Sequence, residues 1–343
     1  MADGGRRRRA FIGSFTAAGG PGVVTAAVHP HSGALALLES VDGVPDPSYL
    51  ALAPGGRTLY AVSETADGAV AAYHVHDDKP RLAGPPVPVD ASGPTHLSVF
   101  GGHVLTANYG SGSVSAVPVR PDGTPAPVPS GVLQHTGSGP HERRQRAPHA
   151  HQVQPDPSGR WAVSVDLGTD SVRVCTLQRG VPVLHREFAL RPGSGPRHLV
   201  FHPDGRYAYV VNELTPTVTV CRWDAGTGTL RPLSETPVLP GAPVGDAYPS
   251  GIAVSPDGRF LWTATRGEDV LTTFTIEDDR LRRTATVPCG GHWPRALTES
   301  DGHLYAANER SGNITWFTVD VETGAPRYEG QVEIPAPSCI VFG

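Results

Sequence analysis

The sequence predicts an all-β protein, a seven-bladed β-propeller with four antiparallel strands in each blade. A repeated unit carries this prediction, because it restarts seven times and its last copy is cut short by the chain end. Successive copies are spaced by 43 to 54 residues, in or near the range of propeller blades rather than of helical solenoids. The copies open at Pro47, Pro94, Pro148, Pro196, Pro249, Pro294 and Pro337.

Each copy has the pattern of four short strands. An apolar run after the opening proline leads into a tight polar turn, such as Pro203–Arg206 or Pro256–Arg259, where proline and glycine supply the φ values of a reversal. A second apolar run returns from the turn, so the two runs form a hairpin. A third and a fourth run follow, as in 270–276 and 281–288, and four strands make one blade.

The two ends of the chain are predicted to complete one blade together. The last opening, 337–342, has no second run after it, while the chain begins with an unpaired second run at 10–15. Pairing these segments closes the ring and protects two strand edges that would otherwise promote aggregation. We therefore expect one propeller domain over 10–343, preceded by a basic, disordered tail at 1–9.

Composition and charge narrow the choice of partners. A net charge of −5 and a pI near 6.3 argue against a nucleic acid or a membrane surface as the partner. The segment 10–18 is interrupted at Gly13, which makes it a poor signal peptide and too short for a membrane span. The four cysteines are far apart with no C-x-x-C pair, which predicts neither a zinc site nor a disulfide framework, and a cytoplasmic location.

Functional chemistry is expected at one rim of the ring. In an antiparallel hairpin, the first residues of the opening run lie beside the last residues of the second run. The mixture of arginines, carboxylates and a histidine at these positions suits an anionic, oxygen-rich ligand. The charged rim residues are His149, Asp166, Arg197, Glu213, Arg266, Arg295 and Glu309, and Glu64 and Asn108 end the second runs of two earlier copies.

Each candidate also has a structural explanation. Arg295 and Glu309 face each other across a hairpin, where a structural ion pair is the more common outcome. Arg197 and Glu213 favour a functional role instead, because both are expected to point inward at the channel.

The remaining aromatic and histidine residues are expected to be structural. His151 falls where other copies carry Leu or Ile, which favours a packed, hydrogen-bonded histidine. His96 and His198 should alternate to the opposite face. Tyr109 and Trp293 could offer stacking surfaces, but packing at the core or rim is the better explanation.

Five longer segments give the chain a specific resemblance. They are 137–145 (GSGPHERRQ), 148–153 (PHAHQV), 165–170 (VDLGTD), 195–203 (GPRHLVFHP) and 211–214 (VNEL). With them the chain resembles the lactonase family of seven-bladed propellers, which includes propeller-type 6-phosphogluconolactonases and the fungal carboxymuconate lactonising enzymes. The resemblance covers essentially the whole chain.

This resemblance implies particular site residues. His149 matches the first His of the family's P-H-x-H motif, Arg197 the Arg of G-P-R-H, and Glu213 the Glu of N-E-L. Arg266 matches an Arg that ends the second run of the next blade. These residues coincide with the rim residues selected above.

One segment departs from the family pattern. The family usually has a single Arg before Gln145, whereas this chain has Arg143 and Arg144 there and Arg146 just after. Which of the three enters the site stays open, and Arg144 is taken as the candidate. The full set of substrate-binding candidates is Arg266, Asp166, His151, Arg144, Asn108 and Arg295.

The reaction that the resemblance implies is the addition of water to the ring carbonyl of a sugar lactone. Arg197 and Arg266 would bind phosphate or carboxylate and stabilise the oxyanion, because a planar guanidinium pairs with oxygen anions and stays charged. His149 would take a proton from water, oriented by Asp166 or Glu213. Alternatively Glu213 is the base and His149 polarises the carbonyl.

Three functions therefore follow as hypotheses. The first is hydrolysis of 6-phosphogluconolactone in the pentose phosphate pathway by a monomer or weak homo-oligomer, without a cofactor. The second is an isomerising reaction on a carboxymuconate-type substrate, and the third is a non-catalytic binding propeller, since a fold does not fix a function. A Ca²⁺ or Mg²⁺ site at Glu64, Asn108 and Glu213 is disfavoured because the inward arginines would repel a cation.

Overall fold

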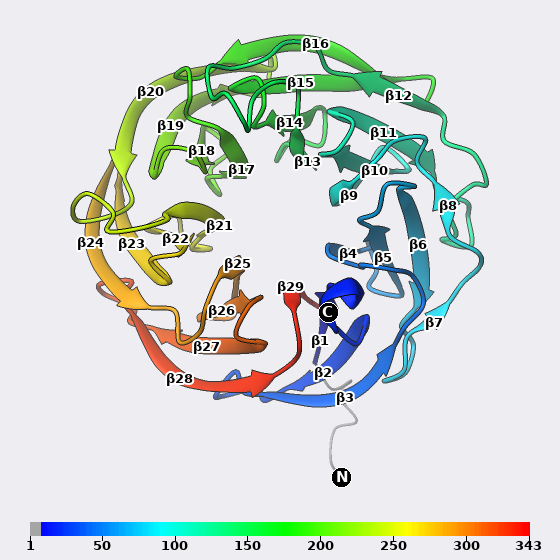
Figure 1. The fold of residues 1–343 in the computed structure, drawn as a ribbon, viewed down its shortest axis with the longest axis horizontal. Coiled ribbons are helices and arrows are strands. Elements are labelled where there is room, and N and C mark those ends of the chain that lie inside the picture. The colour runs from blue at the N-terminus through cyan, green and yellow to red at the C-terminus, as the bar shows by residue number, and fades with distance from the viewer. Residues whose placement is uncertain (1–7) are drawn as a thin grey trace.

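The structure is a computed structural model and describes residues 8–343. Within this range, seven sheets radiate around a common axis (Figure 1). In each sheet the strand nearest the axis belongs to the predicted opening run, and the later strands lie progressively farther out. The inner strands are β4 (Leu50–Leu52), β9 (Pro94–Phe100), β13 (Ala150–Pro155), β17 (Pro196–Phe201), β21 (Tyr248–Val254), β25 (Pro294–Ser300) and β29 (Pro337–Phe342).

Antiparallel pairing adds the other strands outward from these. The second strands are β1 (Arg9–Ser14), β5 (Thr58–Ser63), β10 (His103–Asn108), β14 (Ala162–Asp166), β18 (Tyr207–Asn212), β22 (Phe260–Arg266) and β26 (His303–Asn308). The third strands are β2 (Val23–Val28), β6 (Ala69–His74), β11 (Ser113–Pro118), β15 (Ser171–Gln178), β19 (Thr217–Asp224), β23 (Val270–Glu277) and β27 (Asn313–Val319). The outer strands are β3 (Leu35–Val41), β7 (Arg81–Leu82), β8 (Val87–Pro88), β12 (Gly131–Gln134), β16 (Val181–Ala189), β20 (Thr229–Pro237), β24 (Arg280–Pro288) and β28 (Pro326–Glu333).

One sheet has its outer strand in two pieces. Both β7 and β8 pair with β6, and Pro85 and Pro86 lie between them. Because proline has no N–H to donate to a ladder, the edge strand is interrupted there. The other six sheets of the described range have four strands each, as the sequence predicts.

The ring closes as predicted, by pairing β29 with β1. The ladder places Ala10 opposite Phe342 and Ile12 opposite Ile340. A short 3-10 helix, η1 (Thr16–Ala18), follows β1. The innermost strand of this blade therefore comes from the C-terminus, and its other three strands come from the N-terminus.

The predicted boundary of the basic tail needs a correction. Arg9 belongs to β1, is buried, and donates a hydrogen bond to the carbonyl of Val75. Arg8 forms an ion pair with Asp301. Both residues are therefore part of the propeller. The rest of the predicted tail, 1–7, lies outside the described residues.

The hydrophobic core is divided among the interfaces between blades. Seven clusters of buried residues occur in the described range, and each is shared by two neighbouring sheets. For example, Val163 and Trp161 of one blade pack with Val210 and Trp223 of the next. Apolar burial therefore holds the blades together, and the inner ends of the sheets can carry polar side chains.

A β-bulge recurs at one end of the inner hairpins. In each case one residue of the inner strand has no partner in the second strand, which re-aims its side chain. These bulged residues are Thr95, His151, Arg197, Arg295 and Ser338. In the β13 blade Ala150, not Pro148, pairs with the end of the second strand. His151, rather than His149, is therefore the counterpart of Arg197 in the ring.

Candidate active site at the rim of the inner hairpins

Glu213 brings three arginines together at the bulged end of the hairpins. Its carboxylate lies 2.6 Å from Arg144, 3.2 Å from Arg197 and 2.8 Å from Arg266. Glu213 directly follows β18, Arg197 is the bulged residue of β17, and Arg266 ends β22. Arg144 comes from the loop between β12 and β13. Side chains from two neighbouring blades and one loop therefore converge on this carboxylate.

Burial and charge set the protonation of this cluster. The side chains of Glu213 and Arg197 are each 3% exposed, whereas that of Arg144 is 35% exposed. Burial alone would raise the pKa of Glu213, but the arginines outweigh burial and lower this pKa to about 2. Burial, together with repulsion from neighbouring arginines, lowers the pKa of Arg197 and Arg266. One carboxylate faces three guanidiniums, so the cluster keeps an excess of positive charge.

A second ion-pair cluster lies at the same rim, around Arg295. Its guanidinium is 3.4 Å from Glu309 and 3.6 Å from Glu64. Glu64 also accepts hydrogen bonds from the hydroxyls of Ser48 and Thr95. The ion pair expected between Arg295 and Glu309 is thus present. Two carboxylates share this arginine, which leaves less positive charge here than around Glu213.

His149 lies on the loop just before β13 and stacks on Tyr109. The ring centroids are 4.4 Å apart and the ring planes meet at 18°. The His149 Nδ1 lies 2.8 Å from the Tyr109 carbonyl oxygen. Since a carbonyl can only accept, Nδ1 carries the hydrogen, and the lone pair of the neutral imidazole is on Nε2. Arg144 donates to the Tyr109 hydroxyl at 3.2 Å, so Tyr109 joins the histidine to the arginine cluster.

Of the three candidate arginines in this loop, Arg144 is the one that contacts Glu213. Arg143 is exposed, and Arg146 donates to the carbonyl of Glu142. The turn is fixed by Gln145, which is fully buried and donates to the carbonyl of Leu167 at 2.8 Å. The sequence alone could not show which arginine enters the site, because all three lie within the four residues 143–146.

His151 belongs to a buried aromatic cluster with two other histidines. Its ring lies 5.1 Å from the ring of His198, and the ring of His96 lies 5.5 Å from that of His198. These rings come from the inner strands β9, β13 and β17 of three blades and meet between them. Burial and the charge of Arg197 lower the pKa of all three histidines, so they are neutral near pH 7.

Asp166, expected to bind substrate, is instead enclosed in its blade. It is fully buried, and its carboxylate lies 2.6 Å from His135 and 3.0 Å from Arg173. It also accepts the backbone N–H of His149 at 2.9 Å and of Gly168 at 2.9 Å. Asp166 therefore anchors the backbone at His149 and does not contact the imidazole.

Asn108, also a substrate-binding candidate, is likewise fully buried and saturated. It accepts from Thr106 and donates to Ser113 and Ser115 within its own sheet. Its counterpart Asn212 is also buried, and its amide nitrogen donates to two threonines of the next strand. Asn108 and Asp166 are therefore structural residues of their blades.

Most rim residues of the site lie one position later in the sequence than these buried structural residues. Side chains alternate along a strand, so a shift of one residue exchanges the two faces. The polar residue that ends a second strand turns into the sheet, and its successor belongs to the rim. The successors are Glu64, Tyr109, Glu213 and Glu309, whereas Arg266 is itself the last residue of its second strand and follows the polar Thr265. Most copies of the repeat have, at or near the end of their second strand, a polar residue that is followed by Glu, Tyr or Arg. This pattern is the sequence signal that could have identified Tyr109 as a rim residue.

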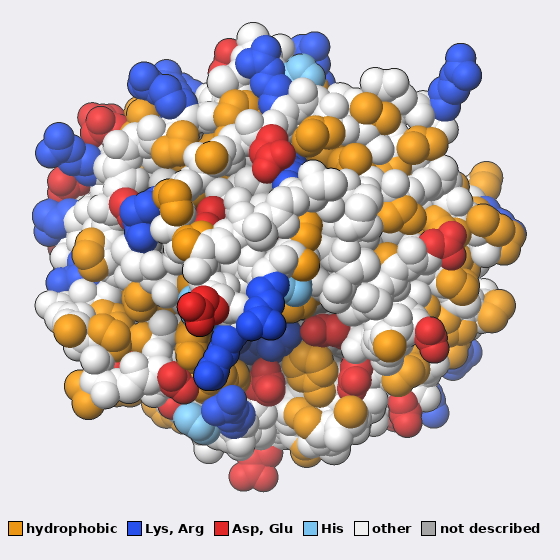
Figure 2. All heavy atoms as spheres, turned by 45° about the horizontal axis from the view of Figure 1, so that its top comes forward, with side chains coloured by type: hydrophobic (Ala, Val, Ile, Leu, Met, Phe, Trp, Pro, Cys, Tyr) orange, Lys and Arg blue, Asp and Glu red, His pale blue; other side chains and the backbone are white. Residues whose placement is uncertain are grey.

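The surface at this site is hollowed and charged. On the face shown in Figure 2, basic, acidic and histidine side chains gather around a hollow near its middle. No group of three or more His, Cys, Asp or Glu residues in 8–343 has the arrangement of a metal site. The four cysteines are buried and free of disulfides. In the same range, no helix has the length and apolar character needed to cross a membrane.

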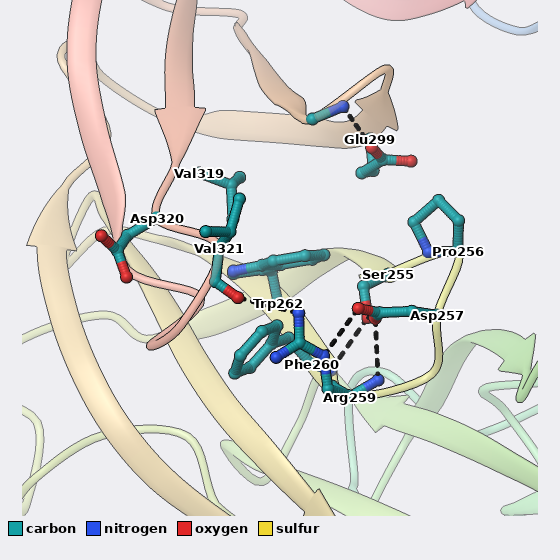
Figure 3. Close-up of a pocket in the computed structure, with 11 residues that line it drawn as sticks. Ser255, Pro256, Asp257, Arg259, Phe260, Trp262, Glu299, Val319, Asp320 and Val321 are labelled. Carbon is teal, nitrogen blue, oxygen red and sulfur yellow. Dashed lines mark hydrogen bonds and ion pairs between the residues drawn. The ribbon is translucent and has the colours of Figure 1, made fainter.

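A separate cavity lies at the other end of β21 and β22. It measures about 260 Å³, and Phe260 and Trp262 are among its walls (Figure 3). Its arginine, Arg259, is held by Asp257 and by the carbonyl of Val321. None of the predicted site residues lines it, so it offers no alternative location for the expected chemistry.

Comparison with known proteins agrees with this architecture. The family model described as "Lactonase, 7-bladed beta-propeller" matches residues 9–342. A 6-phosphogluconolactonase of Bacillus subtilis is 34% identical over 97% of this chain and 97% of its own length. A 6-phosphogluconolactonase of Formosa agariphila is 31% identical over 92% of this chain and 93% of its own. The solved periplasmic gluconolactonase of Pseudomonas aeruginosa is 30% identical, with a TM-score of 0.91 over 98% of this chain and 99% of that one. The chain is a member of the lactonase family of seven-bladed β-propellers.

Proposed function

We propose that this protein hydrolyses 6-phosphogluconolactone to 6-phosphogluconate, a step of the pentose phosphate pathway. Two relatives that match nearly the whole chain are named 6-phosphogluconolactonases. The observation that carries the proposal is the pairing of an excess of buried positive charge around Glu213 with a histidine whose Nε2 lone pair is available. This combination suits the addition of water to an anionic ester.

His149 is the proposed general base. With its hydrogen on Nδ1, its Nε2 can accept a proton from an attacking water molecule. Stacking on Tyr109 and the backbone anchor at Asp166 fix the position of the imidazole. The water oxygen bonds to the lactone carbonyl carbon, and the ring C–O bond then breaks. His149 returns the proton to the departing ring oxygen, which becomes the hydroxyl of the sugar acid.

Glu213 is proposed to position the arginines and not to act as the base. A carboxylate with a pKa of about 2 is a weak base at neutral pH, and all of its arginine partners would have to be separated from it first. Its role is to keep buried Arg197 and Arg266 compensated and aligned.

Arg197 and Arg266 are proposed to stabilise the oxyanion that forms when water adds. Both are almost fully buried, and a charged donor in a site with little water interacts strongly with developing negative charge. One well-placed donor of this kind contributes about 10²- to 10³-fold to kcat.

The test is the loss of lactone in the presence of the purified protein. We expect turnover of 6-phosphogluconolactone and a fall in kcat of about 10²- to 10⁴-fold in His149→Gln. The matched control is His185→Gln, an exposed histidine of the outer strand β16. Wild-type kcat in His149→Gln would refute the assignment of the base. Turnover of an open diene acid with no lactonase activity would instead support the carboxymuconate-type reaction, and no turnover at all a binding propeller.

The remaining parts of the proposal concern location and assembly. We propose a cytoplasmic protein that acts on a small anionic lactone as a monomer or weak homo-oligomer, without nucleic acid or membrane partners. Four buried free cysteines are compatible with a reducing compartment. Cell fractionation and light scattering of the purified protein test these points.

A further inference from the structure

A cavity of about 630 Å³ lies next to the arginine cluster. Its walls come from the 135–149 loop and from the rim ends of two blades, where Leu214 lies just after β18 and Tyr248 begins β21. The loop contributes His141, Glu142, Arg143 and Arg144. Arg144 also contacts Glu213, so this outer arginine pocket is continuous with the proposed catalytic residues.

The arginines of the inner cluster are poorly placed for a phosphate dianion. Arg197 is bound to Glu213 and donates to the carbonyl of Ser250. Arg266 is bound to Glu213 and donates to the carbonyl of Tyr248. Both are almost fully buried, and a dianion brought to them would lose its hydration and meet the carboxylate of Glu213.

The arginines of the outer pocket differ in both respects. Arg144 uses Nη2 for Glu213 and Tyr109, and its Nε and Nη1 have no bonded acceptor within residues 8–343. Arg143 is exposed and forms no ion pair within the same range. One acidic side chain, Glu142, lines the pocket beside these two guanidiniums, so positive charge remains in excess.

The turn that carries these arginines is held in place. The Gln145 N–H donates to the carbonyl of His141 at 3.0 Å, and the His141 N–H donates to the Gln145 side chain at 3.0 Å. The Gln145 amide reaches into the blade and donates to Asp170 at 2.8 Å. Arg143 and Arg144 are therefore presented from a fixed backbone, which reduces the entropy lost when they bind an anion.

We propose that the outer arginine pocket binds the phosphate group of a phosphorylated lactone through Arg143 and Arg144, and that it selects phosphorylated over unphosphorylated lactones. This inference rests on the proposed lactone hydrolysis. It assigns separate tasks to the two sets of arginines, with the solvated phosphate outside and the reacting carbonyl at the buried inner pair.

The kinetic test compares two substrates in three variants. We expect Arg143→Gln and Arg144→Gln to lower the ratio of kcat/KM for 6-phosphogluconolactone to that for gluconolactone by about tenfold or more, the effect of losing one charge-assisted contact. Arg146→Gln is the matched control, because Arg146 is in the same turn but bonds to the carbonyl of Glu142, and we expect it to keep the wild-type ratio. An unchanged ratio in both test variants would overturn the proposal.

A binding measurement separates this inference from the proposed function. Calorimetry with 6-phosphogluconate and with gluconate reports the phosphate contact without any turnover. Tighter binding of 6-phosphogluconate by the wild type, lost in Arg143→Gln and kept in Arg146→Gln, would support the pocket even if no lactone is hydrolysed, in which case the proposed function alone would fail. Equal affinity of the wild type for both acids would refute the pocket even if lactones are hydrolysed.

Discussion

Asp166 and Glu213 lie at the same rim of neighbouring blades, and both are buried carboxylates paired with buried arginines. Their surroundings differ. The acceptors of Asp166 are used by His135, by Arg173 and by backbone N–H groups of its own turn. Glu213 accepts from arginines of other segments, and one of them, Arg144, borders an open cavity.

This difference shows how a structural carboxylate of the propeller can be distinguished from one that belongs to a functional site. Burial and an ion pair are common to both carboxylates, so neither property identifies function. The distinguishing feature is what lies beyond the partners. The partners of Asp166 are themselves buried, so this carboxylate stabilises the scaffold. Glu213 binds arginines of its own blade, of the next blade and of a loop, and the loop arginine borders an open cavity.

The largest expected effect is a contrast between the two buried arginines. Arg197→Gln should lower kcat/KM for 6-phosphogluconolactone by about 10²- to 10³-fold, because an oxyanion donor is lost. Arg173→Gln should lower the free energy of unfolding by about 3–5 kcal/mol, because the buried charge of Asp166 would lose its arginine partner. Steady-state kinetics and denaturant unfolding of both variants measure this.

The comparison would break down if the two variants behaved alike. A severe loss of kcat in folded Arg173→Gln would give the Asp166 cluster a direct part in catalysis. Full activity in Arg197→Gln would remove the oxyanion role from the Glu213 cluster.

The next prediction concerns the acid stability that Glu213 provides. Its pKa falls from 4.5 to about 2 on folding, so its contribution is complete above pH 4.5 and is lost as the pH falls toward 2. A shift of this size corresponds to about 3 kcal/mol. Glu213→Gln should therefore be less stable than the wild type at pH 7, and the difference should shrink between pH 4.5 and 2. Chemical unfolding at several pH values measures it, and a difference that is constant with pH would contradict the assigned ion pairs.

The smallest predicted effect belongs to the neutral histidine cluster behind the arginines. The folded state lowers the pKa of His96, His151 and His198 below 6.5, so the unfolded chain binds more protons and stability falls as the pH drops below 6.5. Removing one such histidine with His198→Gln should reduce this slope by about 1.4 kcal/mol per pH unit. His185→Gln, an exposed histidine, serves as the control. An unaltered slope in His198→Gln would show that the cluster titrates normally.

Much of the fold could be predicted from the sequence, and the errors have a local cause. The repeat placed the strands and the closing pair correctly, because alternating apolar runs and turns are local signals. The site positions were less secure. Asn108 and Asp166 were misassigned because strand ends are uncertain by a residue, and one residue exchanges the faces of a strand.

A second error concerns which histidine corresponds to Arg197 in the repeat, and it also arises from a shift in strand register. Prolines open most of the inner strands, but in the β13 blade the ladder begins at Ala150. The repeat therefore aligned His149 with Arg197, whereas the bulge aligns His151 with it. A bulge depends on the pairing of two strands, and no single run of residues encodes it.

The sequence by itself determined the number of blades, the closure of the ring and the residue types at the rim, because these follow from short-range pattern and from chain order. Only the tertiary structure decided that Arg144 contacts Glu213, that Tyr109 carries His149, and that Asp166 is sealed in its blade. The first two contacts join residues from different blades or loops, so their geometry depends on how the blades pack around the axis. Packing between blades, which is set by buried apolar surface, therefore determines which rim side chains can meet.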